Sequence, residues 1–201
     1  MARRIEKRNV KKPVIVICSE GGKKSTEYLY FRNFASRNLR IQFSTGNSTD
    51  PKGMLNDLLK YINNEDIKNE DFYKIFLVLD TDLDERRINE IKLIKKECDK
   101  HNIEIITSAP TFEIWFLMHY RKKNLIFKTS KDVKKELQNI NGVYKETMDM
   151  YNVIKDLTND AKNTAKSLRQ QTEKNNEDLL TSNPHTNVYK ILEAIDEFKK
   201  I

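Results

Sequence analysis

The sequence has few residues of the kinds that hold disulfide frameworks or zinc. Its 201 residues include only two cysteines, Cys18 and Cys98, and three histidines that lack the spacing of metal ligands. We therefore expect neither a disulfide-stabilised scaffold nor a zinc site. No apolar run approaches the roughly 20 residues that span a bilayer, and the N-terminus has no apolar segment typical of a signal peptide. These absences predict a cytoplasmic protein without membrane contact.

What the chain does have is charge. Charged residues make up 33% of it, and its formal net charge is +7, which suits a polyanionic partner such as nucleic acid. Residues 1–12 carry six basic side chains and a single acidic one. We expect this N-terminal segment to be a solvated tail, with contact to phosphates as the alternative.

Predicted strands and helices alternate through most of the first 120 residues. Strands are expected at 14–18, 40–44, 76–80 and 104–108, and helices at 26–37, 51–62, 85–101 and after residue 111. This order predicts an α/β fold with a mainly parallel four-stranded sheet and helices on both faces. Beyond residue 130 only helices are expected, including a long one over 146–171 and a last one that opens near Asn183.

The same pattern suggests a division of the chain into three segments. We expect a basic tail over 1–12, an α/β core over 13–125, and a helical extension over 126–201 that packs on the core. This division follows from the place where the strand pattern stops.

The stretch 76–82 (Phe-Leu-Val-Leu-Asp-Thr-Asp) holds the most informative residues. Its apolar run is typical of a strand buried on both faces, and ligands in such sheets bind at the carboxyl ends of strands. Asp80 and Asp82 fall at that end, and alternation along a strand would point them the same way. Mg²⁺ between them is one interpretation. The other is a helix N-cap with solvated acids, because Asp84 and Glu85 suit a first helical turn.

Two further acids follow predicted strands. Glu20 precedes Gly21-Gly22 and a helix that Ser25 is expected to cap. Glu113 lies in a very apolar segment after Thr111, which is expected to cap a short helix. Solvation of a turn explains Glu20 equally well, and support of a helix dipole explains Glu113.

If the strands are neighbours, these acids gather in one cleft. Such a cluster in a basic protein predicts one or two Mg²⁺ or Mn²⁺ ions, which stabilise the attacking and leaving oxygens of a phosphodiester displacement. Lys23 and Lys24, beside the first turn, are candidates for contact with substrate phosphate. The sequence singles out no nucleophilic Ser, Cys or Tyr, so water is the expected nucleophile.

Several segments together resemble a known family. A strand that ends in Glu-Gly and a later strand that ends in Asp-x-Asp are similar to the Toprim fold, and the whole chain more closely resembles the RloB-like family. The matching segments are Cys18–Gly21 with Thr26-Glu27, Val78–Asp82, Ser108–Pro110 with Phe112–Trp115 and His119-Tyr120, and Asn183–Val188.

This resemblance implies a Toprim-like α/β domain that acts as a Mg²⁺- or Mn²⁺-dependent nuclease on DNA or RNA, tRNA included. It implies that Glu20, Asp80 and Asp82 bind metal and carry the catalysis, and it extends less directly to Asp84 as a ligand and Glu113 as a catalytic residue. It also implies an ABC/SMC-like ATPase partner and a role in phage defence. The extra glycine and two lysines after Glu20 depart from the shorter turn of many members.

Two other functions remain open at this point. In the first, the chain is a non-catalytic, Toprim-shaped partner of that ATPase, and the acids of this chain are dispensable for defence. It is alternatively a nucleic-acid-binding subunit whose acids only cap helices, so that binding ignores Mg²⁺. The sequence also leaves open a homo-oligomer.

Overall fold

The fold is seen in a computed structural model that describes residues 12–44, 46–120 and 125–200. Its centre is a five-stranded sheet of order β2-β1-β3-β4-β5. The strands are β1 (Val14–Cys18), β2 (Arg40–Ser44), β3 (Tyr73–Asp80), β4 (Ile103–Ala109) and β5 (His185–Thr186). Strands β1 to β4 are parallel, and β5 pairs with β4 in the antiparallel direction. The expected α/β fold is confirmed, with one strand more than the four expected.

The fifth strand was expected to be part of the opening of the last helix. It is only two residues long, so it leaves no alternation in the sequence. Side chains hold it to β4: the Ser108 and Thr186 hydroxyls lie 2.9 Å apart, and Oδ1 of Asn187 accepts a 2.6 Å hydrogen bond from the Thr107 amide. The segment 183–188 therefore completes the sheet.

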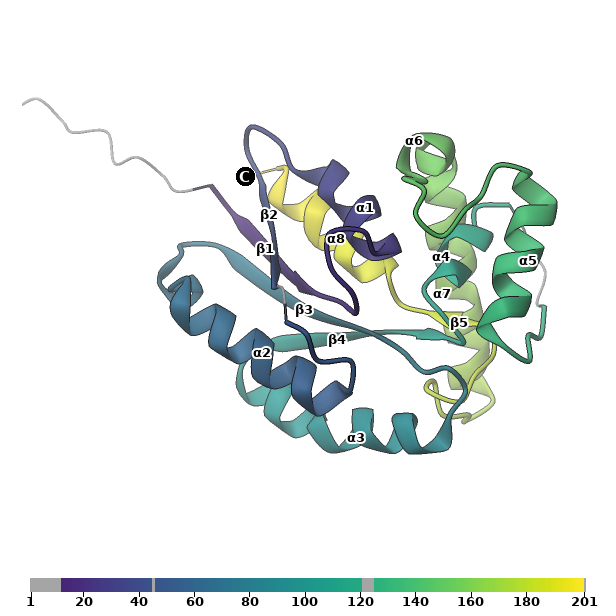
Figure 1. The fold of residues 1–201 in the computed structure, drawn as a ribbon, viewed down its shortest axis with the longest axis horizontal. Coiled ribbons are helices and arrows are strands. Elements are labelled where there is room, and N and C mark those ends of the chain that lie inside the picture. Colours follow the sequence, from purple (N-terminus) through teal and green to yellow (C-terminus); the bar gives the residue numbers. More distant parts are fainter. Residues whose placement is uncertain (1–11, 45, 121–124, 201) are drawn as a thin grey trace, which may run out of the picture.

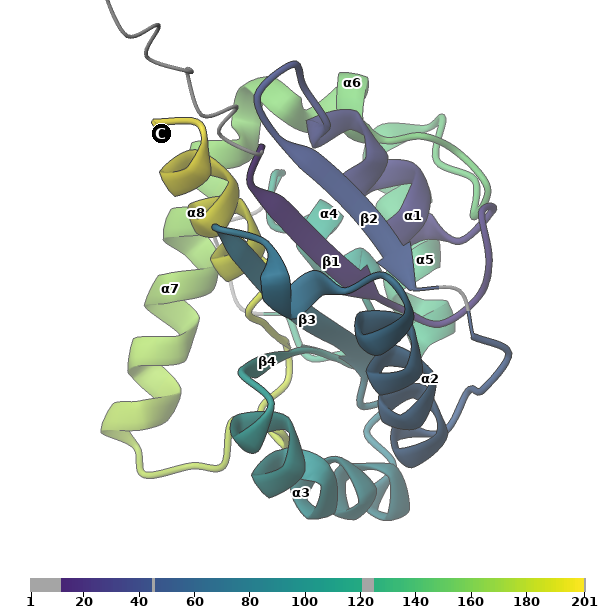
Figure 2. The same cartoon turned by 90° about the vertical axis from the view of Figure 1, so that its left-hand side faces the viewer.

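Helices cover both faces of the sheet (Figures 1 and 2). On one face lie α2 (Pro51–Asn64) and α3 (Glu85–Lys100), and on the other lie α1 (Thr26–Phe31) and α8 (Tyr189–Phe198). Successive β1 residues alternate between the two layers: Val14 and Val16 pack under α2 and α3, and Ile15 and Ile17 pack on the opposite side. This burial on both faces is why the strands are continuous apolar runs in the sequence.

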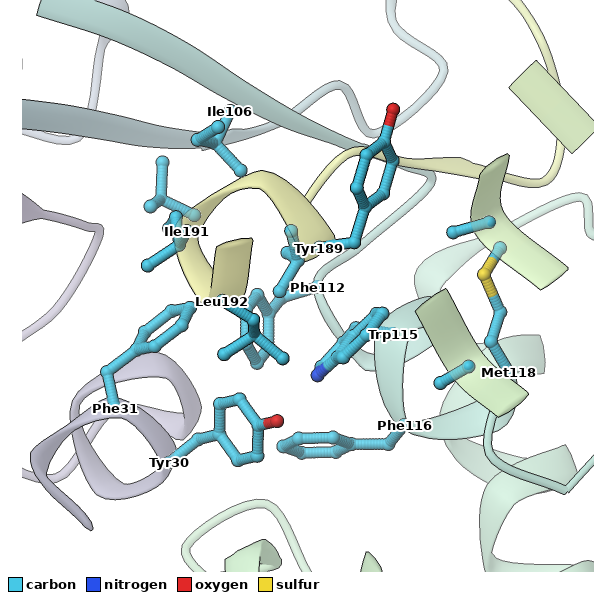
Figure 3. Close-up of a cluster of buried hydrophobic side chains, with 14 of the residues drawn as sticks. Tyr30, Phe31, Ile106, Phe112, Trp115, Phe116, Met118, Tyr189, Ile191 and Leu192 are labelled. Atoms are coloured by element: carbon cyan, nitrogen blue, oxygen red, sulfur yellow. The ribbon is translucent and has the colours of Figure 1, made fainter. Parts of the chain in front are cut away.

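The core on the α1 side is rich in aromatic residues (Figure 3). Helix α4 (Glu113–Leu117) inserts Trp115 and Phe116, both fully buried. The Phe116 ring meets those of Phe112 and Tyr30 edge to face, with centroids 5.4 Å apart in each pair. Such pairs contribute about 0.5–1.5 kcal/mol beyond their buried area. This packing fixes α4 at the end of β4.

The later helices differ from the expectation of one long helix over 146–171. After α5 (Ser130–Asn141), the chain forms α6 (Tyr151–Ile154), a 3₁₀ turn (Lys155–Leu157) and α7 (Thr158–Lys174). The residues Thr158-Asn159-Asp160 favour a helix start over a helix interior, and Asp160 lies in the first turn of α7. The first predicted helix is also shorter, since α1 ends at Phe31 and continues as a 3₁₀ turn (Arg32–Phe34).

The division of the chain into core and extension stays a prediction. Strand β5 and helix α8 come from the segment predicted as an extension, yet they join the sheet and the apolar core. Residues 1–11 of the predicted basic tail lie outside the described residues. Among the helices of the described part of the chain, none has the length and apolar character needed to cross a membrane.

Candidate active site

The strand order places two of the predicted acids at one edge of the sheet. Strand β1 lies between β2 and β3. The connection from β1 to β2 therefore runs over one face of the sheet, and the connection from β2 to β3 runs over the other. The register pairs Cys18 of β1 with Leu77 of β3. Glu20 follows the carboxyl end of β1, and Asp80 ends β3 beside it. Such a point of reversal is where open α/β sheets bind ligands.

The Asp80 side chain is partly buried at this edge, less deeply than Glu113 and Glu27. Its Oδ2 accepts a 2.9 Å hydrogen bond from the Thr111 hydroxyl, whereas its Oδ1 is buried and has no hydrogen-bond partner. Burial raises the pKa of Asp80 well above its ordinary value, and the Glu27 and Glu113 carboxylates raise it further. The surroundings of Asp80 therefore stabilise its ionised carboxylate less well than water does.

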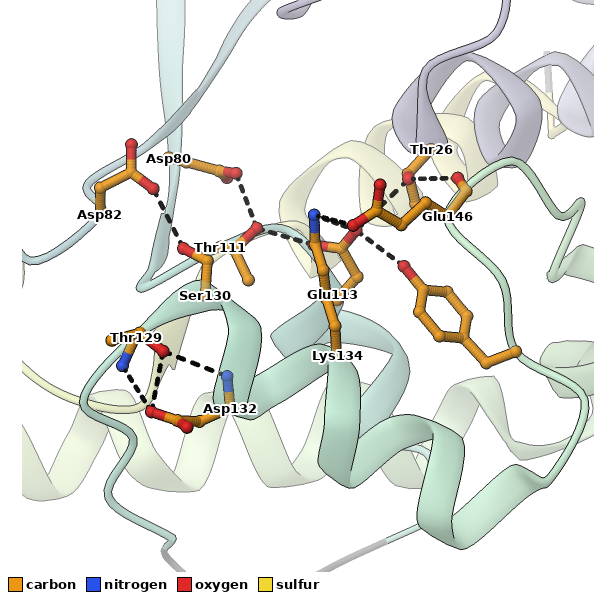
Figure 4. Close-up of polar contacts among 11 residues, drawn as sticks. Thr26, Asp80, Asp82, Thr111, Glu113, Thr129, Ser130, Asp132, Lys134 and Glu146 are labelled. Atoms are coloured by element: carbon orange, nitrogen blue, oxygen red, sulfur yellow. Dashed lines mark hydrogen bonds and ion pairs between the residues drawn. The ribbon is translucent and has the colours of Figure 1, made fainter.

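Glu113 is buried, and both of its carboxylate oxygens have hydrogen-bond donors nearby (Figure 4). Oε1 lies 2.8 Å from the Tyr144 hydroxyl, 3.3 Å from the Thr26 hydroxyl and 3.9 Å from Nζ of Lys134. Oε2 accepts a 2.7 Å bond from Thr111. Three of these donors come from α1 and from the segment after residue 130, so distant parts of the chain fix this side chain.

The sequence predicted that Thr111 caps α4, but in the structure Thr111 links Asp80 and Glu113 instead. The N-cap position belongs to Phe112, which makes no side-chain cap bond. The Thr111 hydroxyl lies within hydrogen-bond distance of both Asp80 and Glu113. Because a hydroxyl has one proton to donate, both contacts form together only when one carboxyl group carries a proton. The raised pKa of Asp80 agrees with this geometry.

Glu27 is a site residue that sequence reasoning missed. The sequence pattern indicates only an acid in the first turn of a helix, within the Thr26-Glu27 segment that resembles the family. The structure buries it. Burial raises its pKa to about 7, and the nearby Glu113 and Glu20 carboxylates add to the rise. The packed side of α1 consists of Thr26, Glu27, Tyr30 and Phe31, and no local pattern in the sequence identifies that side.

Asp82 lies in a turn rather than on the strand. Strand β3 ends at Asp80, and Asp82 and Leu83 have φ values of 51° and 57°. Aspartate adopts this left-handed region more readily than most residues. The expectation that alternation aligns Asp80 with Asp82 is therefore wrong, although the turn still leaves both at the same edge (Figure 4). The Asp82 side chain is 49% exposed and accepts a 3.1 Å bond from Ser130.

Arg87 of α3 is a second residue that the sequence did not single out. Its Nη2 lies 3.1 Å from Oε1 of Glu20, and its Nε lies 3.7 Å from Oδ2 of Asp82. The guanidinium also donates to two backbone carbonyl oxygens, those of Asp80 at 2.6 Å and Thr49 at 3.1 Å. A single cation thus joins Glu20 and Asp82 to the end of β3.

The other predicted site residues have plainer surroundings. Asp84 is the N-cap of α3 and accepts a 2.9 Å bond from the Arg87 amide, so the capping interpretation applies to it. Lys23 and Lys24 are exposed in the turn after Gly21. The φ of Gly21 is +77°, a value that glycine adopts readily. Metal binding by Asp84 and phosphate contact by the two lysines stay predictions.

The chemistry of these side chains suits a hard divalent cation. Carboxylate oxygens are the ligands that Mg²⁺ and Mn²⁺ prefer, and the buried Oδ1 of Asp80 has no other partner. As they stand in the described part of the chain, no three His, Cys, Asp or Glu side chains are grouped so as to hold a metal ion. Two of the expected ligands, Glu20 and Asp82, pair with Arg87.

The fold and the site define an α/β protein of Toprim-like architecture, with acidic residues gathered where its mostly parallel sheet reverses strand order. The family model for RloB-like proteins matches residues 15–195, and the chain belongs to this family. The matched range contains every site residue described above. Comparisons with curated proteins and with solved structures gave no match.

Proposed function

We propose that this protein is a metal-dependent nuclease that cleaves phosphodiester bonds of DNA or RNA, tRNA included. The observation that carries the proposal is a group of three carboxyl groups at the carboxyl edge of the sheet, of which Glu27 and Glu113 are buried and Asp80 is partly buried. The Glu113 carboxylate raises the pKa of both Asp80 and Glu27, and acids with a raised pKa cluster at functional sites.

The proposed cofactor is Mg²⁺ or Mn²⁺, held by Asp80 together with Glu20 and Asp82. When bound, such an ion stabilises the charge that develops on phosphate oxygens during hydrolysis. The unpaired Oδ1 of Asp80 supports this assignment, since a cation satisfies an oxygen that the protein leaves without a donor.

The chain's own residues position these acids. Thr111 contacts Asp80 and Glu113 at once and so fixes their relative orientation. Tyr144 and Lys134 hold Glu113 from the opposite side. For Lys134, burial opposes the charged form, but the hydrogen bond to Glu146 and the Glu113 and Asp80 carboxylates outweigh it and raise the pKa. The ammonium group therefore stays charged beside the buried acids.

The proposed context is phage defence with an ABC/SMC-like ATPase as partner, which the RloB-like family membership supports. The net charge of +7 favours association with a nucleic acid substrate.

The test uses the purified chain, with and without the proposed ATPase partner, on plasmid DNA and on total tRNA in Mg²⁺ or Mn²⁺. Asp80→Ala, Asp82→Ala and Glu20→Ala are assayed alongside, with circular dichroism as the check on folding. We expect cleavage by the wild type and loss of cleavage in the folded variants. No cleavage under any condition, with intact ATPase binding, would replace the nuclease by a regulatory subunit.

A further inference from the structure

We propose that Arg87 competes with the divalent cation for Glu20 and Asp82, so that metal binding requires the guanidinium to leave these carboxylates. The inference rests on the proposed function, because it concerns the same site. It adds a residue that limits when the site accepts its metal.

The contacts of Arg87 carry the argument. Its guanidinium lies 3.1 Å from a Glu20 oxygen and 3.7 Å from an Asp82 oxygen, and the Arg87 side chain is only 17% exposed. Arginine remains charged at every physiological pH, so this positive charge is permanent. A divalent cation bound to the same oxygens would meet both a like charge and occupied lone pairs.

The Arg87 side chain can move without a change in the backbone of α3. The backbone of Arg87 is fixed independently, because its amide donates to the N-cap residue Asp84. The ion pair with Glu20 is partly exposed, with 34% of the Glu20 side chain open to solvent, and ion pairs of this kind are weak enough to be exchanged. Movement of the side chain alone thus suffices, and it also releases the backbone carbonyl oxygens of Asp80 and Thr49 that the guanidinium contacts.

There is also space and charge to receive the displaced guanidinium. A cavity of about 400 Å³ adjoins Arg87 and Asp82, and its lining includes three further acidic residues, Asp50, Asp84 and Glu90, and one other basic residue, Arg86. A side chain that leaves Glu20 therefore enters a region that still favours a positive charge.

The test is a Mn²⁺ titration of the full chain by isothermal calorimetry. In Arg87→Gln we expect Mn²⁺ to bind at least ten-fold more tightly than in the wild type. The matched control is Arg86→Gln: Arg86 precedes Arg87 on the same helix, is 86% exposed and pairs with Glu90. This control should bind Mn²⁺ as the wild type does. Equal or weaker binding by folded Arg87→Gln would overturn the inference.

A second measurement needs no stable Gln variant. The side-chain Nε–H signal of Arg87 in the wild type, assigned by its loss in Arg87→Lys, should shift when Mg²⁺ is added. An unchanged signal at a Mg²⁺ concentration that saturates the site would refute displacement.

The two proposals fail separately. If the wild type and Arg87→Gln bind Mn²⁺ equally, the metal-dependent function stands and only the role of Arg87 is lost. If neither protein binds Mn²⁺, the proposed function fails and this inference fails with it.

Discussion

The Tyr144 hydroxyl lies 2.8 Å from Oε1 of Glu113, which joins the segment after α5 to the first residue of α4. Tyr144 is 4% exposed and Glu113 3% exposed, so the contact is shielded from water. The part of the chain beyond residue 126 thus supplies a hydrogen bond to the buried acids.

Tyr144→Phe removes this bond and leaves the ring in place. Hydrogen bonds to charged groups contribute about 1.5–3 kcal/mol, so we expect the free energy of unfolding to fall by about 2 kcal/mol and nucleic acid cleavage to slow. Urea denaturation and the cleavage assay measure these effects. Tyr61→Phe, on α2 across the sheet, is the matched control, and an equal loss in both variants would show that the Glu113 contact is unimportant.

Asp80→Asn is expected to be inactive yet more stable than the wild type. Since the pKa of Asp80 is raised in the folded state, its carboxyl group favours folding below its ordinary pKa, and that contribution is lost as the pH rises toward the folded value. The amide does not ionise. We expect the variant to be more stable than the wild type at pH 7.5 and the gain to disappear near pH 4.

Thermal unfolding of Asp80→Asn at the two pH values measures this difference. Asp82→Asn, which makes the same chemical change at a half-exposed side chain, serves as its control. If Asp80→Asn is less stable than the wild type at pH 7.5, the ionised Asp80 carboxylate does not destabilise the fold.

Thr111→Val tests the hydroxyl that contacts both Asp80 and Glu113. The valine keeps the shape but donates nothing, so the two carboxyl groups lose their link, and we expect at least a ten-fold drop in the cleavage rate. Thr111→Ser retains the hydroxyl and should keep most of the activity. Equal activity in the Val and Ser variants would exclude a positioning role.

Two buried histidines predict a loss of stability in acid. Burial lowers the pKa of His119 and His185 to about 4, and at His185 the charges of Arg169 and Lys190 add to the effect. The unfolded chain binds more protons than the folded chain between pH 6.5 and 4, so each histidine lowers stability as the pH falls, by about 2 kcal/mol at pH 5.

His185→Gln should therefore lose less stability than the wild type between pH 7 and pH 5. Chemical denaturation at both pH values gives the difference, and His101→Gln, at a partly exposed residue of a surface ion pair, is the control. A parallel pH dependence in His185→Gln and the wild type would show that His185 does not contribute.

Much of the fold was predictable because its signals are local. Each apolar strand run and each helical period lies within a few residues, and Asp50 and Pro51 open α2 as predicted. Strand β5 was not predictable, because two paired residues have no period and depend on side-chain contacts with Thr107 and Ser108.

The candidate site was predictable only in part, for the same reason. The strand ends identified Glu20, Asp80 and Glu113 as neighbours in a parallel sheet. The roles of Glu27 and Arg87 depend on how helices α1 and α3 pack on the sheet, and no local pattern records that. The left-handed turn at Asp82 likewise follows from tertiary contacts, since its amide bonds to the Pro110 carbonyl oxygen at 2.9 Å.

The most direct test of the central claim is cleavage of plasmid DNA and total tRNA by the purified protein, with its ATPase partner present, in Mg²⁺ and in excess EDTA. We expect cleavage by the wild type in Mg²⁺ that stops in EDTA and is absent in folded Asp80→Asn. Cleavage that persists in EDTA or in Asp80→Asn would contradict a metal-dependent nuclease centred on Asp80.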